Sequence, residues 1–341
     1  MVTIKDVAKS AGVSYSTVSR ALADSPLVDS KTKKKILRVA ESLHYVPNQM
    51  ARGLKGGKSK TILLVVPTLI NTFFPQLIMY FEEELRQRGY ALLLGVSNYD
   101  KAEERRCFET ARTFSADGVL FVSGTDDCDH MQKLIDGCGA PVVLVNRVWN
   151  LGVTCVTNDN KSGAYHAIEH LIGCGHRRVA CVIGDISIQH FRERYEGCVQ
   201  AFQDNGIPLE NVQFLHRETS QQVYEAACAL FDGPDRPTAF FVASDWLASG
   251  VYSAAAHCGL SVPADVSVVG FDDIENSKYM IPPLTTWHHS IDEIAGIAAD
   301  MLVRRIDGET QGWGSTIVVP GRLVERGSVS APPAGADGGT V

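Results

Sequence analysis

The chain has 341 residues, of which 45% are hydrophobic and 21% charged, so it is globular rather than disordered and long enough for two or three domains. No apolar run approaches the roughly 20 residues that a membrane span requires, and the polar N-terminus lacks the apolar stretch of a secretory signal, so we expect a cytoplasmic protein. The nine cysteines are odd in number and form no Cys-x-x-Cys pair, which is typical of buried thiols in a reducing compartment.

Charge is distributed unevenly along the chain. Residues 1–60 carry 12 Lys and Arg against 4 Asp and Glu, a net of +8, whereas the whole chain carries −7, so the remainder sums to −15. A basic segment attracts polyanions and an acidic body repels them. Any contact with DNA is therefore expected at the N-terminal end.

Residues 3–22 predict two short helices joined by a tight turn. Thr3 and Asp6 have the spacing of a capping box, and apolar residues at positions 4, 7, 8 and 11 share one helical face. Gly12 ends this helix, and Ser14 is suited to cap the next one. The outward positions of the second helix are Tyr15, Ser16, Ser19 and Arg20. This pattern is typical of a helix-turn-helix whose second helix enters the DNA major groove.

A third helix is predicted to begin near Ser30 and to end before Pro47. Three helices in this space make a small headpiece. Residues 47–60 are basic and rich in glycine, and Asn48 can cap one or two helical turns. So short a helix is marginal by itself, so DNA or partner contacts would decide whether it forms.

From residue 61 onward, short apolar strands alternate with amphipathic helices. The predicted strands are 62–66, 91–95, 118–122, 142–145, 179–183, 239–242 and 266–269. The predicted helices are 75–88, 103–114, 161–172, 187–205, 222–231, 246–258 and 291–307. This alternation indicates parallel sheets covered on both faces, and its length indicates two similar lobes. The last residues, 330–341, are rich in Pro, Gly and Ala and are predicted to form a disordered tail.

Several short motifs, taken together, point to a known family. They are residues 3–22, Tyr45-Val46-Pro47-Asn48, Ala51-Arg52-Gly53-Leu54, Asn158-Asp159, Arg194-Tyr195-Glu196-Gly197, Ser244-Asp245, and residues 269–273, 283–286 and 323–328. On these motifs the chain resembles the LacI/GalR family of bacterial transcription regulators from about residue 2 to residue 329. The resemblance implies a small all-α helix-turn-helix headpiece followed by an α/β effector body of two doubly wound, periplasmic-binding-protein-like lobes.

The resemblance also implies a division of the chain. It gives a headpiece over 1–46, a hinge helix and linker over 47–60, and an effector-binding and dimerisation domain over 61–329. The N-lobe would hold 61–159 and 288–318, and the C-lobe 160–287 and 319–329. Three crossover strands would join the lobes, and the ligand would bind in the cleft between them, at the carboxyl ends of the strands.

For DNA binding, the resemblance implies that Tyr15 and Ser16 read operator bases and that Ser19 and Arg20 add base or phosphate contacts. It also implies that Leu54 wedges into the minor groove and kinks the DNA. The other predicted DNA-binding residues are Thr3, Ser14, Thr17, Asn48, Ala51, Arg52 and Lys55. Each of two residues has an open alternative. Arg20 can be a solvated charge that contacts no DNA, and Leu54 can pack between two hinge helices of a dimer. Thr3, Ser14, Thr17, Ser30 and Asn48 can donate to phosphates or can equally serve as helix caps alone.

The predicted ligand-binding residues are Phe73, Phe74, Asp159, Arg192, Arg194, Asp245, Asp272 and His289. A carboxylate facing a guanidinium suits the vicinal hydroxyls of a sugar or polyol. The open alternatives are an ion pair between Arg194 and Asp272, and helix capping by Asp159 and Asp245. One phenylalanine is expected in the core and the other against the ligand.

Two departures from the family pattern bear on the ligand. Asn146 precedes Arg147 where an Asp is common, and His288-His289 occupy positions that are usually Arg or Lys and Gln. The ligand then differs from that of relatives, or pH tunes its affinity.

The sequence thus predicts a homodimeric repressor that binds near-palindromic operator DNA and is modulated by a small effector. No membrane partner, cofactor or metal is expected, because Cys174, His176 and Cys181 have unsuitable spacing for a metal site. The alternatives are a co-repressor-dependent or activating regulator and, more remotely, a sugar-binding or sugar-modifying protein. The lack of an export signal and of a Gly-x-Ser-x-Gly elbow counts against the last two.

Overall fold

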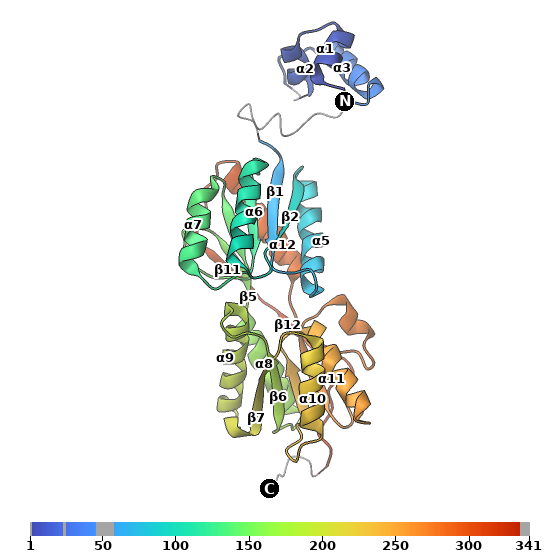
Figure 1. Cartoon of the computed structure of the whole chain (residues 1–341), viewed down its shortest axis with the longest axis vertical. Coiled ribbons are helices and arrows are strands. Elements are labelled where there is room, and N and C mark those ends of the chain that lie inside the picture. The colour runs from blue at the N-terminus through green and yellow to red at the C-terminus, as the bar shows by residue number, and fades with distance from the viewer. Residues whose placement is uncertain (1, 23–24, 46–57, 335–341) are drawn as a thin grey trace. The chain divides into compact units, whose positions relative to one another are not determined.

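The computed structural model describes residues 2–22, 25–45 and 58–334, and its chain divides into two compact units, 1–59 and 60–341 (Figure 1). The first unit contains the helices α1 (Ile4–Ala11), α2 (Tyr15–Leu22) and α3 (Ser30–Ser42). Each helix packs on the other two, around a small core that includes Val7, Val18 and Ile36. The predicted all-α headpiece is confirmed.

Local capping explains where these helices begin and end. The backbone N of Thr3 donates to Oδ2 of Asp6 at 2.8 Å, as the capping box requires. Gly12 follows α1 in the left-handed conformation with φ 66°, which side chains with a Cβ disfavour. Asp29 caps α3 by accepting from the backbone N of Lys31 and Thr32, so Ser30 is the first helical residue rather than the cap.

The first lobe of the second unit, called here the N-lobe, is built on a six-stranded sheet. Its strands are β1 (Thr61–Val66), β2 (Ala91–Val96), β3 (Gly118–Val122), β4 (Val142–Val145), β5 (Cys155–Asn158) and β11 (Thr316–Val319). They lie in the order β11-β5-β4-β3-β1-β2 and all neighbours are parallel. The sequence did not predict β5 and β11, which have four residues each.

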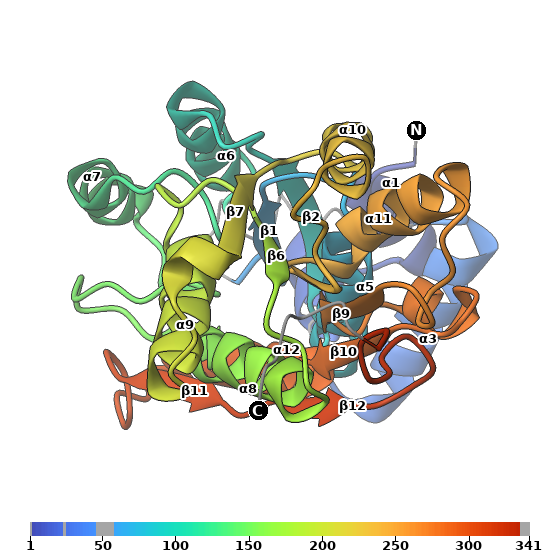
Figure 2. The same cartoon turned by 90° about the horizontal axis from the view of Figure 1, so that it is seen from below.

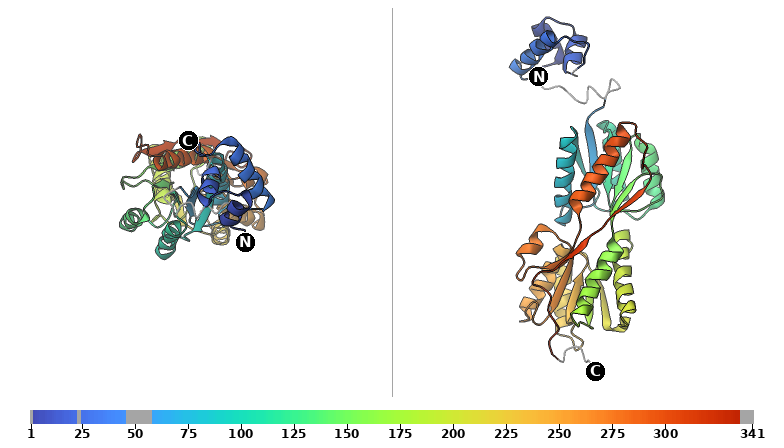
Figure 3. Two further views of the ribbon diagram at one scale, coloured as in Figure 1. Left: turned by 90° about the horizontal axis from the view of Figure 1, so that it is seen from above. Right: turned by 180° about the vertical axis from the view of Figure 1, so that it is seen from behind.

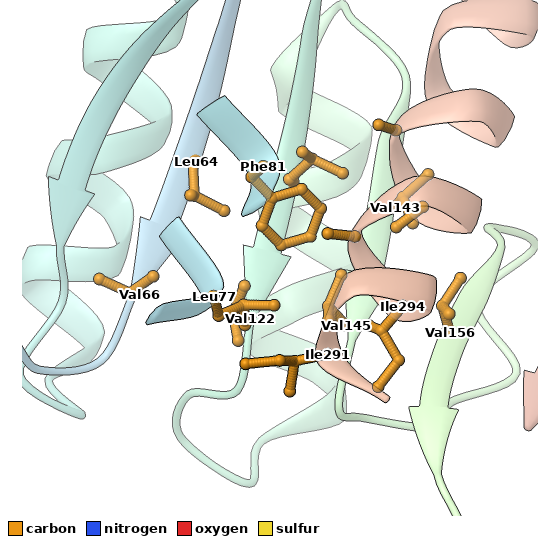
Figure 4. Packing of buried hydrophobic residues seen from close by; sticks show 14 of the residues in the cluster. Leu64, Val66, Leu77, Phe81, Val122, Val143, Val145, Val156, Ile291 and Ile294 are labelled. Atoms are coloured by element: carbon orange, nitrogen blue, oxygen red, sulfur yellow. The ribbon is translucent and has the colours of Figure 1, made fainter. Parts of the chain in front are cut away.

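Helices cover both faces of this sheet. They are α5 (Phe73–Gln87) and α12 (Ile291–Ile306) on one face, and α6 (Lys101–Thr113) and α7 (Cys128–Cys138) on the other. Within β1, Leu64 packs toward α5 and α12, and the adjacent Leu63 toward α6 and α7. Figure 4 shows Leu64 close to Phe81 of α5. A strand buried on both faces needs a continuous apolar run, since each buried Leu contributes about 1.5–3 kcal/mol.

The second lobe, the C-lobe, repeats this design. Its strands are β6 (Val179–Ile183), β7 (Val212–His216), β8 (Ala239–Val242), β9 (Ser267–Asp272), β10 (Thr285–His288) and β12 (Arg322–Val324), in the order β12-β10-β9-β8-β6-β7. Only β12 is antiparallel to its neighbour. Helices α8 (Asn160–Gly173) and α9 (Gln189–Asp204) cover one face, and α10 (Ser220–Phe231) and α11 (Asp245–His257) cover the other (Figure 2).

The chain passes between the two sheets three times. It does so from β5 to α8, from β10 to α12, and from β11 to β12, the last being the red segment that runs between the lobes in Figure 3. The chain crosses to the other lobe directly after the carboxyl ends of β5 and β10. The carboxyl ends of the parallel strands in both sheets therefore face the junction between the lobes. Ligands of doubly wound sheets bind at such strand ends. None of the helices in the described ranges has the length and apolarity of a membrane span.

Candidate functional site

The outward face of α2 carries the residues predicted to read DNA. Tyr15, Ser16 and Arg20 are exposed, while Val18 and Ala21 hold the opposite face in the headpiece core. Within the headpiece, this face is therefore exposed rather than part of the core. The DNA contacts themselves stay predictions.

Several hydroxyls near α2 also have a local structural role. The backbone N of Thr17 donates to Oγ of Ser14 at 3.1 Å, so Ser14 caps α2. The same oxygen lies 2.8 Å from the hydroxyl of Ser16 and 2.8 Å from that of Thr17. Capping is thus in place without DNA, as it is for Thr3 in α1, and Ser19 is half-buried. The hinge residues Asn48, Ala51, Arg52, Leu54 and Lys55 lie outside the described residues.

At the junction of the lobes, Arg194 of α9 forms an ion pair with Asp272 at the end of β9. Its Nη1 lies 3.3 Å from Oδ1 of Asp272, and each side chain is only 4% exposed. Oδ2 of Asp272 accepts from Ser244 Oγ at 2.7 Å, and Nε of Arg194 donates to Oδ1 of Asn160 at 3.0 Å. The guanidinium lies over the ring of Phe271, 4.0 Å from its centroid. The ion pair weighed as an alternative is therefore present.

The electrostatics of this pair extend to two histidines. Burial raises the pKa of Asp272 to about 7, although the charge of Arg194 opposes the shift. His289 places Nε2 3.8 Å from Oδ1 of Asp272 and 3.4 Å from Nη2 of Arg194. Burial, followed by the charge of Arg194, holds the pKa of His289 and of His190 well below the usual range. Both imidazoles are therefore neutral at pH 7 and can donate one hydrogen bond and accept another.

Phe73 and Phe74 begin α5 and are both buried, with ring centroids 5.3 Å apart in an edge-on arrangement. The ring of Phe73 also meets that of His289 at 6.3 Å. Phe73 therefore lies toward the polar residues of the junction, and both rings belong to the N-lobe core.

The contacts of Asp159 and Asp245 favour structural roles. Asp159 caps α8 by accepting from the backbone N of Ser162 at 3.0 Å, the alternative that the sequence left open. Asp245 is not a cap, because Ser244 occupies that position in α11. Its two oxygens accept from Ser277 Oγ, Thr286 Oγ1 and the backbone N of Ile274, at 2.6, 2.7 and 3.2 Å. With three protein donors already on it, Asp245 links β10 and the segment after β9 to α11.

The predicted ligand residue Arg192 points to the other lobe. Its side chain is 42% exposed, and Nη2 lies 3.0 Å from Oδ2 of Asp126, which follows β3. Arg192 therefore contacts a protein carboxylate across the junction rather than the Arg194–Asp272 pair.

The structure adds polar groups that the sequence reasoning missed. Asn158 ends β5, Ser97 follows β2 and Ser123 follows β3, and all three are buried. Both amide atoms of Asn158, the two hydroxyls and Nδ1 of His190 have no hydrogen-bond partner within the part of the chain that the structure describes. A buried polar atom without a hydrogen-bond partner lowers the stability of the folded state. A polar ligand that supplied the missing hydrogen bonds would remove this penalty, so these atoms are suited to bind one. Position at the end of a parallel strand was the one signal that could have found them.

Comparison with known proteins adds the evolutionary context. Residues 3–48 match the model described as bacterial regulatory proteins, lacI family, and residues 168–329 match a periplasmic binding protein-like domain. The HTH-type transcriptional regulator DegA of Bacillus subtilis (strain 168) is 33% identical over 332 residues, which cover 96% of this chain and 98% of DegA. The chain belongs to the LacI family.

Solved structures agree with this membership. The lac repressor dimer bound to operator and the anti-inducer ONPF has a TM-score of 0.87 at 26% identity, covering 97% of this chain and 99% of that one. A complex of the transcriptional regulator CelR with cellobiose has a TM-score of 0.71 at 28% identity, covering 96% and 100%. The headpiece and the two α/β lobes are those of a LacI-family transcriptional regulator, a class of DNA-binding proteins and not of enzymes. Among the described residues, no group of His, Cys, Asp and Glu fits a metal ion.

Proposed function

We propose that this LacI-family protein is a homodimeric repressor that acts in the cytoplasm on near-palindromic operator DNA, with an affinity set by a sugar or polyol bound between the lobes. In this proposal residues 1–46 are the headpiece, 47–60 the hinge and linker, and 61–329 the effector-binding and dimerisation domain. The supporting observation is the buried Arg194–Asp272 pair at the strand ends of the junction, surrounded by neutral polar groups.

DNA recognition rests on the α2 face in this proposal. Tyr15, Ser16, Ser19 and Arg20 contact bases and phosphates in the major groove, with Thr3, Ser14 and Thr17 on neighbouring phosphates. Asn48, Ala51, Arg52, Leu54 and Lys55 form the hinge contacts, with Leu54 as the wedge at the central step. The net charge of +8 over residues 1–60 supports this placement.

The hydrogen-bonding groups of the junction favour an uncharged, polyhydroxylated effector. Among the described residues, Arg194 is paired with Asp272, and Arg147 and Arg192 are paired with Asp126, so each of these arginines already has a carboxylate partner in the protein. The atoms without a partner belong to neutral groups, Asn158, Ser97, Ser123 and His190. Such groups match hydroxyls, which donate and accept. Phe73 and His289 border the same region, and the solved structure of the related regulator CelR is a complex with cellobiose.

Dimerisation is supported by large apolar side chains that are exposed on both lobes. On the N-lobe they are Leu69, Ile70, Met79 and Tyr80, and on the C-lobe they are Tyr279 and Ile281, and we take them as the proposed dimer surface. A hollow of about 1080 Å³ is lined by α5 residues, including Met79 and Tyr80, and by C-lobe residues such as Glu275 and Lys278. A large exposed apolar patch with a polar rim is typical of a protein interface.

Selection of bound sequences from random duplex DNA tests this function. The wild type is expected to enrich a near-palindrome with a fixed central step, and Arg20→Ala and Leu54→Ala are expected to weaken it. Arg105→Ala, which removes a cation from α6 of the body, is the control and should leave the selection unchanged. Salt-sensitive binding without any sequence preference would refute the operator proposal.

The selected operator then allows the effector to be tested. A panel of neutral mono- and disaccharides is added to the protein–operator complex. Release indicates an inducer and tightening a co-repressor, and by linkage DNA changes the affinity for the sugar by the same factor. The position of the operator relative to its promoter separates repression from activation. No response to any neutral sugar, together with a response to anionic ligands, would contradict the proposed effector class.

A further inference from the structure

Asp126 of the N-lobe binds arginines from both lobes. Its Oδ1 accepts from Nη1 of Arg147, which follows β4, at 2.6 Å. Its Oδ2 accepts from Nη2 of Arg192, on α9 of the C-lobe, at 3.0 Å. One carboxylate therefore joins the two lobes, and these three residues are called here the Asp126 cluster.

The N-lobe half of the cluster is firmly built. The side chain of Arg147 is fully buried, and its Nη2 donates to the carbonyl of Gly124. The guanidinium also lies over the ring of Trp149, 4.5 Å from the centroid. These contacts all lie within one lobe, so they hold Asp126 in place whether or not Arg192 engages it.

The C-lobe half is open to solvent. Arg192 is 42% exposed, and its Nη1 donates to the carbonyls of Ile186 and Ser187 at 3.2 Å each. A hollow of about 510 Å³ beside it is lined by residues of both lobes, including Asp126 and Ser187. Water and salt therefore reach the Arg192–Asp126 contact, and exposed ion pairs are weakened by salt.

A second bond crosses the junction next to this ion pair. The backbone N of Val148 donates to Oε1 of Gln189 at 3.1 Å. Gln189 is the first residue of α9, and the same helical turns carry His190 and Arg194. Helix α9, which carries the candidate effector contacts His190 and Arg194, is therefore bonded to the N-lobe at its first turns.

From this geometry we propose that the Asp126 cluster is a salt-sensitive latch that holds the lobes closed over the effector cleft. Asp126 and Arg192 are then positioning residues. The sequence predicted that Arg192 contacts the ligand, whereas in this proposal it acts through Asp126. The inference rests on the proposed function only in taking the junction as the effector site. Breaking the ion pair frees the start of α9 and with it moves His190 and Arg194 away from the N-lobe.

Hydrogen–deuterium exchange of the full-length protein tests the latch without DNA or effector. Arg192→Gln is expected to speed exchange of the Val148 amide and of peptides over 186–192 several-fold at low salt. Wild type should reach the same rates in about 1 M sodium chloride, where the Debye length is about 3 Å. Asp126→Asn should match Arg192→Gln. Lys101→Gln is the control, because it removes a neighbouring ion pair, Lys101–Asp127, that lies within the N-lobe.

Two results would overturn the latch. One is exchange at Val148 that is equal in wild type, Arg192→Gln and Lys101→Gln at every salt concentration. The other is faster exchange spread evenly over β1 and β6, since that indicates general destabilisation rather than opening of the junction. Either result with an unchanged operator selection contradicts the latch and leaves the proposed regulator intact.

Discussion

The guanidinium of Arg194 and the carboxylate of Asp272 meet at 3.3 Å in a site where both side chains are 4% exposed. They come from different elements, α9 and the end of β9. Asp272 also has a φ of 119°, in the left-handed region that a side chain with a Cβ rarely occupies. A buried pair held on a strained strand end is consistent with a binding role rather than with stability alone.

Asp272→Asn is expected to change how stability depends on pH. The folded-state pKa of Asp272, about 7, lies above its unfolded value near 3.9. The folded state therefore holds the proton more tightly, and the stability from this group is lost as pH rises from about 4 through 7. Relative to wild type, Asp272→Asn should therefore gain stability as the pH rises across this window, by at most about 1 kcal/mol per pH unit. Urea unfolding at several pH values measures it.

The control for the Asp272→Asn variant is Glu275→Gln, which breaks an exposed ion pair with Lys278. Its stability relative to wild type should stay flat between pH 5 and 8, because Glu275 has a lowered pKa and is ionised throughout. An equally flat difference for Asp272→Asn would show that Asp272 is ionised across this range.

The two buried histidines should give the opposite pH dependence. Their folded-state pKa values lie well below 6.5, so on acidification the unfolded chain binds protons at these imidazoles and the folded protein does not. The contribution of the two neutral histidines to the free energy of unfolding is therefore present above about pH 6.5 and is lost as the pH falls below it. The double variant His190→Gln/His289→Gln should therefore lose less stability than wild type between pH 7 and 5.5. The control is His166→Gln, at an exposed site, which should lose as much stability as wild type over this pH range. An equal loss for the double variant would contradict the prediction.

Two glycines of α8 provide a matched test of packing in the C-lobe core. A Cβ at Gly163 would lie 2.6 Å from Nε1 of Trp287, whereas a Cβ at Gly173 meets nothing within 4 Å. Gly163→Ala should cost about 1–3 kcal/mol by overpacking, and Gly173→Ala should gain up to about 1 kcal/mol from helix propensity. Thermal unfolding compares them. Equal effects would mean that Trp287 moves aside without cost.

The proposed dimer surface predicts an effect on assembly. Ile70→Glu combined with Met79→Glu places charge on two side chains that are 75% and 72% exposed. If this surface is the interface, the dimer dissociation constant should rise at least tenfold, which corresponds to about 1.4 kcal/mol. Sedimentation equilibrium measures it. Phe114→Glu, at an exposed apolar residue after α6, should leave assembly unchanged, and a shift as large as that of the double variant would argue against the interface.

The sequence by itself determined the local architecture. The Thr3–Asp6 capping box and Gly12 predicted the bounds of α1, because capping and left-handed turns depend on neighbouring residues. Continuous apolar runs such as 62–66 predicted the central strands. The three-residue β12 and four-residue β11 were missed, since so short a run forms a strand only when a neighbouring strand provides its hydrogen bonds.

Only the tertiary structure decided how the polar residues are used. Asp245 and Asp272 are similar in sequence, each an acidic residue near a buried strand, yet one is occupied by three protein donors and the other faces Arg194. Likewise, nothing local distinguishes Arg192, which reaches Asp126 in the other lobe, from Arg194, which stays in its own. Pairing of side chains depends on the register and crossing of distant strands, and that information arises only when the two sheets pack.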